Sequence, residues 1–258
     1  MTGLDHCGAL LAAHGERGGG ADNSSVERLA AGLSRQGLEV HFGFIKGTPT
    51  IAEAMRACTA PRLLVYPLFL ADGFFTRIRL PQLIAEAGPP HSGCVIEILP
   101  PLGLDPGLAS LVATKASEAA RTGGCPEHQV TIVLLAHGST NDAASHRAAD
   151  ALARELRAPN RFRAVACAFL EEPPALKDAV ARAPGPIVVV GLFAGEGLHG
   201  HEDVARLMAG LRRRDIAFAG NVGTWPEIVD IVAAAIGNQR LTAQIDRAPL
   251  VEAANAKT

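Results

Sequence analysis

The chain has 258 residues, of which 48% are hydrophobic and 19% charged, a composition typical of a globular protein with a substantial core. Its formal net charge of −2 provides no overall basic field, which disfavours a nucleic-acid partner. No apolar run reaches the roughly 18–20 residues that cross a bilayer, and the first residues lack a basic and apolar leader. We therefore expect a cytoplasmic protein with no membrane partner.

Strands and helices are predicted to alternate along the first half of the chain. The expected elements are a strand over 7–13, a helix over 26–33, a strand over 38–45, a helix over 50–57, and strands over 62–69 and 94–99. The strands are apolar through their length, and the helices have apolar residues at helical spacing. This order predicts an α/β fold with a parallel sheet that helices cover on both faces.

The second half repeats this order. The expected elements are strands over 129–136, 163–170, 186–193 and 216–222, and helices over 141–156, 175–183, 201–214 and 226–236. A turn-rich stretch around 122–126 separates the halves. We therefore expect one domain over 1–124 and a second over 125–258, with a polar tail after about residue 239.

Three pairs of matching segments indicate that the halves arose by duplication. Residues 10–15 (LLAAHG) match 134–138 (LLAHG), and the other two pairs are 43–46 with 168–171 and 68–75 with 192–199. The residues that follow the strands differ between the halves. The corresponding pairs are His14 and His137, Lys46 and Glu171, Phe75 and His199, and Arg79 and Asp203.

The second half carries a set of residues that can bind a metal. His137, Glu171 and His199 each follow a strand, and the carboxyl ends of parallel strands meet at one edge of a sheet. Imidazole and carboxylate both bind divalent transition metals, and three loop ligands leave positions open for a substrate. Asp203 is expected to orient His199. The same groups also suit acid/base chemistry without a metal, or a structural role for each histidine, and these alternatives stay open here.

Other kinds of site are poorly supported. The glycine-rich stretch 15–20 lacks the spacing and the following Lys-Ser/Thr of a nucleotide loop, so no nucleotide cofactor is expected. Ser139 follows His137-Gly138 outside any Gly-x-Ser-x-Gly turn, which disfavours a hydrolase triad. The cysteines are spaced singly and are expected to be free thiols: Cys7, Cys58, Cys94, Cys125 and Cys167.

Taken together, these segments resemble the sirohydrochlorin chelatases, the ATP-independent class II chelatases of cobalamin and siroheme synthesis. The resemblance is carried by Ala136-His137-Gly138-Ser139, by Phe169-Leu170-Glu171 with Pro173-Pro174, by 193–199 with Asp203, and by the segment 221–226 (NVGTWP). It implies two similar flavodoxin-like, chelatase-like domains, each a parallel sheet flanked by helices, that face each other across a cleft. It covers both halves to about residue 236.

The resemblance also implies an activity, the insertion of Co²⁺ or Fe²⁺ into sirohydrochlorin without ATP. His137, His199 and Glu171 would bind the metal and take up pyrrole protons, with Asp203 supporting them. The metal and the exact tetrapyrrole stay open. A tetrapyrrole or metal carrier without turnover, built on the same fold, is an alternative function.

The first half is expected to hold the tetrapyrrole rather than a metal. Its basic and aromatic residues suit a ring with acetate and propionate groups, because cations bind carboxylates and aromatic rings stack on a macrocycle. The candidate tetrapyrrole-binding residues are His14, Lys46, Phe75, Arg77, Arg79 and Ser139. The alternative is an unused site that has drifted to solvated charges and a core phenylalanine. Since two halves of one chain can form a cleft, we expect a monomer.

Overall fold

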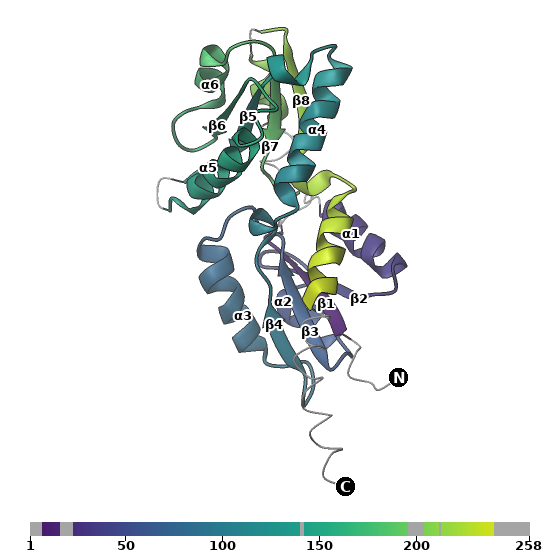
Figure 1. Ribbon diagram of the computed structural model, residues 1–258. Coiled ribbons are helices and arrows are strands. Elements are labelled where there is room, and N and C mark those ends of the chain that lie inside the picture. The colour runs from purple at the N-terminus through teal and green to yellow at the C-terminus, as the bar shows by residue number, and fades with distance from the viewer. Residues whose placement is uncertain (1–6, 16–22, 140–141, 196–203, 212, 240–258) are drawn as a thin grey trace, which may run out of the picture.

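The computed structural model describes residues 7–15, 23–139, 142–195, 204–211 and 213–239 (Figure 1). These residues form two four-stranded parallel sheets. The first has the order β2-β1-β3-β4, with β1 (Cys7–Ala13), β2 (Glu39–Phe44), β3 (Arg62–Pro67) and β4 (Val95–Ile98). The second has the order β6-β5-β7-β8, with β5 (Thr131–Ala136), β6 (Ala164–Phe169), β7 (Ile187–Gly191) and β8 (Ile216–Asn221). The predicted α/β fold with two similar parallel sheets is confirmed.

Helices cover both sheets. They are α1 (Ser24–Arg35), α2 (Ile51–Arg56), α3 (Leu80–Ala87), α4 (Leu108–Thr122), α5 (Ala144–Arg157), α6 (Leu176–Arg182), α7 (Val204–Ala209) and a last helix over 228–239. A π-helix over Phe75–Arg79 leads into α3. Helices α3 and α4 lie where the sequence pattern predicted no element. Within the described residues, every helix is too short or too polar to cross a membrane.

Local sequence explains where the elements begin and which face they bury. Strand β1 is buried at every position, as expected for the inner strand of a parallel sheet. Helix α1 buries Val26, Leu29, Ala30 and Leu33, which share one face at helical spacing. Helix α2 begins at a capping box in which Thr50 accepts from the backbone N–H of Glu53 and the Glu53 carboxylate accepts from that of Thr50.

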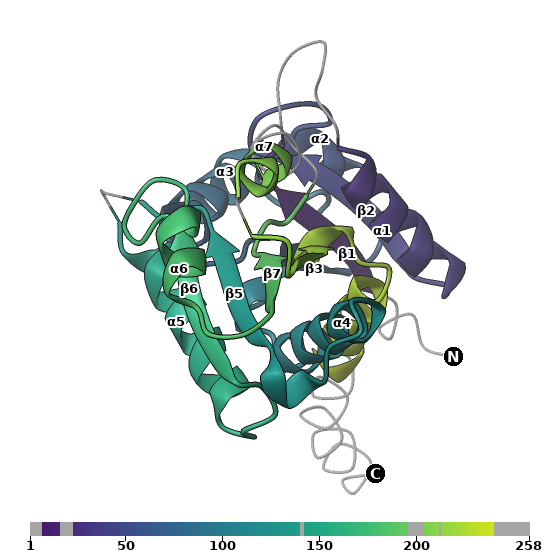
Figure 2. The same cartoon turned by 90° about the horizontal axis from the view of Figure 1, so that it is seen from above.

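The last helix of each half packs on the other half. Helix α4 packs against β7 and β8 of the second sheet. The helix over 228–239 reaches the first half, where Val229 faces Gly32 of α1 and the carbonyl oxygen of Gln239 accepts from Arg62. Figure 1 shows the two helices beside these sheets, and Figure 2 shows both on the same side of the molecule. Because each last helix packs on the other half, the largest apolar cluster contains residues of both halves.

Candidate functional site

A cavity of about 690 Å³ opens where the carboxyl ends of both sheets approach each other. Both halves contribute to its walls, as expected of ligand sites in parallel α/β folds. Six of the predicted site residues line it, namely His14, Lys46, Phe75, His137, Ser139 and Glu171. The structure therefore brings the histidine and the carboxylate of the second half into one space with the basic and aromatic residues of the first.

His137 and Glu171 lie next to each other in this cavity. The His137 Nδ1 lies 3.6 Å from the Glu171 Oε2, and the two side chains are 42% and 55% exposed. The backbone N–H of Glu171 also donates to the carbonyl oxygen of His137 at 3.0 Å. Because this bond ties the end of β6 to the end of β5, the two side chains are held next to each other while both remain accessible from the cavity.

The imidazole of His137 is oriented by its own loop. Its Nδ1 donates to the carbonyl oxygen of Gly138 at 3.2 Å. A carbonyl oxygen can only accept, so the proton of the neutral ring lies on Nδ1 and the lone pair lies on Nε2. A hydrogen bond of this kind, from one ring nitrogen to a backbone carbonyl oxygen, selects the tautomer that can bind a metal through the other nitrogen. His137 is thus prepared to act as a metal ligand or a proton acceptor through Nε2.

The loop after β5 depends on Gly138. This residue has φ +75°, and a Cβ there would lie 2.9 Å from both the Glu172 Cγ and the Phe169 Cβ. Glycine adopts this left-handed conformation without a steric penalty. Its backbone N–H donates to the Ser145 hydroxyl at 3.1 Å, which attaches the loop to the first turn of α5.

Glu172 supports the site and was not singled out from the sequence. Its Oε1 accepts from the backbone N–H of Ser139 at 3.2 Å, and its Oε2 lies 3.5 Å from the Nδ1 of His146. The His146 ring in turn stacks on Phe169, with centroids 4.6 Å apart. Two adjacent glutamates therefore have different surroundings: Glu171 lines the cavity and Glu172 holds the loop. The only sequence signal for this was the pair of consecutive acids.

The first half repeats this geometry with different side chains. The backbone N–H of Lys46 donates to the carbonyl oxygen of His14 at 2.7 Å, and the His14 Nδ1 donates to the carbonyl oxygen of Gly15 at 3.0 Å. Phe75 packs edge-to-face on His14 with centroids 4.7 Å apart, and Phe69 stacks on Phe75 at 6.2 Å. This half thus presents one histidine, one exposed lysine and an aromatic surface to the cavity.

Not every predicted site residue lies at the cavity. Arg77 pairs with Asp72 at 2.7 Å, Arg79 lies 3.7 Å from Glu86, and neither arginine lines the cavity. The hydrogen bond that Arg77 donates to the Asp72 carboxylate raises the pKa of the guanidinium above its usual range. Both arginines belong to the π-helix, whose backbone geometry no sequence pattern had indicated. The predictions for His199 and Asp203 lie outside the described residues.

The start of helix α1 is a polar part of the cavity wall. Asn23 and Ser25 both line the cavity. Ser25 is 6% exposed, and its hydroxyl oxygen has no hydrogen-bond partner among the described residues. A helix N-terminus carries partial positive charge and attracts anions. An anionic group entering the cavity would therefore find both this charge and the Ser25 hydroxyl.

Comparisons with known proteins show which family and which solved structures this chain is similar to. The model of the CbiX family matches residues 8–119 and again residues 131–239. A CbiX described as the terminal enzyme for biosynthesis of siroheme in denitrifying bacteria is 30% identical, with a TM-score of 0.72 over 90% of this chain and 98% of that one. A probable sirohydrochlorin cobaltochelatase from Halobacterium salinarum is 23% identical over 75% of this chain and 77% of that protein.

A third relative shares the fold at lower identity. SirB from Bacillus subtilis, solved with Fe³⁺, is 17% identical, with a TM-score of 0.74 over 93% of this chain and 97% of that one. The similarity extends over both sheets. Two matches of one family model, one to each half, confirm the duplication that the repeated segments had indicated.

Proposed function

The chain belongs to the CbiX family, and from this membership and its cavity we propose that it is a sirohydrochlorin chelatase, a lyase that inserts Co²⁺ or Fe²⁺ into sirohydrochlorin without a nucleotide. The observation that carries the proposal is the pairing of His137 with Glu171 in a cavity walled by both halves. The carrier alternative is not favoured, because the relatives are named as enzymes or chelatases. The division into domains 1–124 and 125–258, the cytoplasmic location and the monomeric state remain proposals.

Metal insertion makes two demands on a protein. Water must leave the metal substrate, and two pyrrole N–H protons must leave the macrocycle. Exchangeable ligands meet the first demand, and nearby bases meet the second. In our proposal, the Nε2 of His137 binds the incoming ion and the Glu171 carboxylate offsets its charge. As the ion passes to the ring, both groups are available to accept protons. His199 is proposed as the second histidine of this set, and Asp203 as its support.

We propose that the first half holds the macrocycle. Sirohydrochlorin carries acetate and propionate groups around its ring, and Lys46 and the N-terminus of α1 with Ser25 offer positive charge and a hydroxyl to them. Phe75 offers a surface on which the ring can stack, next to His14. Ser139 lies on the opposite wall with His137. Arg77 and Arg79 are left out of this set because neither lines the cavity and each pairs with an acid, Asp72 and Glu86 respectively.

An absorbance time course tests the proposal. Sirohydrochlorin is mixed with Co²⁺, and separately with Fe²⁺ under anaerobic conditions, in the absence of ATP. Wild type should accelerate the metal-dependent spectral change over the protein-free reaction, and the His137→Ala/His199→Ala double variant should not. Tetrapyrrole binding without acceleration would instead establish a carrier, and no binding at all would overturn the proposed substrate.

A further inference from the structure

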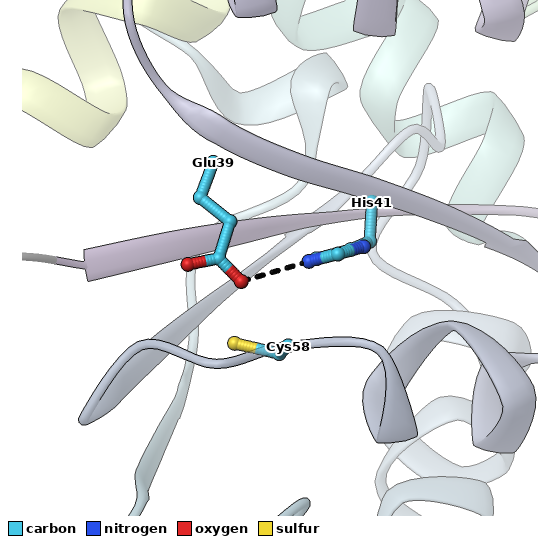
Figure 3. A group of neighbouring side chains, drawn as sticks. All are labelled: Glu39, His41 and Cys58. Atoms are coloured by element: carbon cyan, nitrogen blue, oxygen red, sulfur yellow. Dashed lines mark hydrogen bonds and ion pairs between the residues drawn. The ribbon is translucent and has the colours of Figure 1, made fainter.

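A second group of metal-binding side chains lies at the end of the first sheet that is remote from the cavity. Glu39 is the first residue of β2, and His41 follows it on the same face of the strand. Cys58 lies between α2 and β3 (Figure 3). One ligand atom from each residue lies within 4.8 Å of the other two. The chain passes along the whole of β2 before it reaches Lys46 at the cavity, so the two places are separate.

The carboxylate of this group is already oriented. The Nε2 of His41 donates to the Glu39 Oε1 at 3.0 Å. The backbone N–H of Thr59 donates to the same oxygen at 2.7 Å, and the Thr59 hydroxyl donates to the Oε2 at 3.1 Å. Bonds of this kind from a neighbouring loop hold a ligating carboxylate in position and reduce the ordering that metal binding requires.

The group is shielded but can be reached from solvent. Cys58 is 3% exposed, whereas the Glu39 and His41 side chains are 16% and 20% exposed. Gly8 of β1 lies opposite Glu39 in the sheet register. A Cβ on Gly8 would lie 2.9 Å from the Cys58 Sγ. A glycine on the neighbouring strand therefore leaves the space that the thiol occupies.

We propose that Glu39, His41 and Cys58 bind a divalent transition metal such as Co²⁺ or Zn²⁺ at a site separate from the cavity. A nitrogen, an oxygen and a sulfur donor suit these ions, and a thiolate disfavours Mg²⁺ and Ca²⁺. The three ligands leave a fourth tetrahedral position for water. Cys94 lies beside the group, since its Sγ and that of Cys58 both approach the carbonyl oxygen of Ala60, at 3.5 and 3.9 Å.

Metal binding at this site releases one proton. Burial, with Glu39 and Cys94 adding to it, raises the pKa of the Cys58 thiol to about 11, so the metal-free thiol is protonated at neutral pH. When the metal–sulfur bond forms, the S–H bond breaks and one proton leaves to solvent. His41 moves its proton from Nε2 to Nδ1 and stays neutral, and the Glu39 carboxylate loses its bond from His41 and gains the metal.

Cobalt(II) titration of the reduced protein tests the proposal. A thiolate bound to Co²⁺ produces a charge-transfer band in the near ultraviolet, and no cysteine is among the residues that line the cavity. The band therefore reports metal binding by a thiolate outside the proposed chelatase site, and the variants below decide whether that thiolate is Cys58. We expect it to appear in wild type and in a His137→Ala variant, with an amplitude at saturation that corresponds to one thiolate-bound Co²⁺ per chain.

Three variants test which side chains bind the metal. Cys58→Ser should abolish the band, and Cys167→Ser, which removes a partly buried thiol of the second half, should leave it unchanged. His41→Ala should keep a weaker band with affinity reduced by about 10-fold or more. Absence of the band in wild type would overturn the proposal, and so would its persistence in Cys58→Ser or unchanged affinity in His41→Ala.

The pH dependence offers a second readout. Since binding displaces the thiol proton, the apparent affinity for Co²⁺ should rise with pH, by up to about tenfold for each pH unit, below the thiol pKa of about 11. An affinity that does not change with pH over this interval would mean that no thiol proton is displaced, and would overturn the assignment of Cys58. Chelatase turnover of Cys58→Ser is measured in parallel. Since the proposed metal site is separate from the cavity, loss of the band and loss of turnover can be told apart.

Discussion

The backbone N–H of Glu171 donates to the carbonyl oxygen of His137, and their side chains approach to 3.6 Å. The same backbone bond joins Lys46 to His14 in the first half. The duplicated halves therefore share the backbone bond that brings these two strand ends together. They differ in the side chain at this place: at the position that the acidic Glu171 occupies beside His137, the first half has the basic Lys46.

Removal of this acid/base pair is expected to abolish most turnover. His137→Ala and Glu171→Gln should each lower kcat for metal insertion by about 10²–10⁴-fold, because each removes a positioned proton acceptor. Steady-state absorbance assays with Co²⁺ and sirohydrochlorin measure this. Glu172→Gln serves as the control, since the amide oxygen can still accept from the backbone N–H of Ser139. Full activity in Glu171→Gln would argue against a role for this carboxylate.

Charge reversal at the cavity wall is expected to weaken substrate binding. Lys46→Glu places a carboxylate among the acidic groups of the macrocycle and should raise KM for sirohydrochlorin by about 5-fold or more, which corresponds to roughly 1 kcal/mol of lost charge pairing. Its kcat should change little. Arg79→Glu is the matched control, because Arg79 lies beside Glu86 and does not line the cavity. Equal KM values for the two variants would contradict a substrate-holding role for Lys46.

Gly138 is expected to tolerate no side chain. Gly138→Ala places a methyl group against Glu172 and Phe169 at φ +75°, and should lower the free energy of unfolding by about 1–3 kcal/mol. Urea unfolding monitored by circular dichroism measures the loss. Gly237→Ala is the control: its Cβ would meet nothing within 4 Å, and alanine in a helix should raise stability by up to about 1 kcal/mol. Equal stabilities of the two variants would show that the loop accommodates the methyl group.

The last helices of the two halves are held together by an ion pair. Lys115 of α4 donates to Glu227 at 2.6 Å, just before the last helix. Burial alone would raise the pKa of the Glu227 carboxyl, but the hydrogen bond from Lys115, a backbone hydrogen bond and the charge of Lys115 together outweigh it and leave the pKa below its usual 4.5. The same bond raises the pKa of Lys115 above 10.5. The pair is therefore fully stabilising between about pH 4.5 and 10.5 and weakens beyond either limit.

Glu227→Gln should consequently lower the free energy of unfolding by about 1 kcal/mol at pH 7, because the pair is partly exposed. The difference from wild type should shrink as the pH falls below 4.5 and the carboxyl becomes protonated. Glu118→Gln removes the more exposed partner of Lys115 on the same helix and should cost about 0.2–0.5 kcal/mol. A pH-independent difference for Glu227→Gln would show that its effect is not electrostatic.

The sequence by itself determined the duplication, the parallel α/β organisation and the family resemblance. Apolar runs followed by His137 and Glu171 were sufficient to place these residues at one sheet edge, because parallel strands all end at the same edge. The structure confirms that both residues reach one cavity. For the same reason, His14 and Lys46 could be assigned to the corresponding edge of the first sheet.

Only the tertiary structure decided which sheet each last helix covers, because an amphipathic pattern indicates the apolar face of a helix but not its partner. It also separated Glu171 from Glu172, since adjacent residues differ in role only through contacts made by distant segments. The approach of Cys58 to Glu39 and His41 depends likewise on how β2, β1 and the loop before β3 lie together. Such contacts join residues far apart in the chain, and no local spacing encodes them.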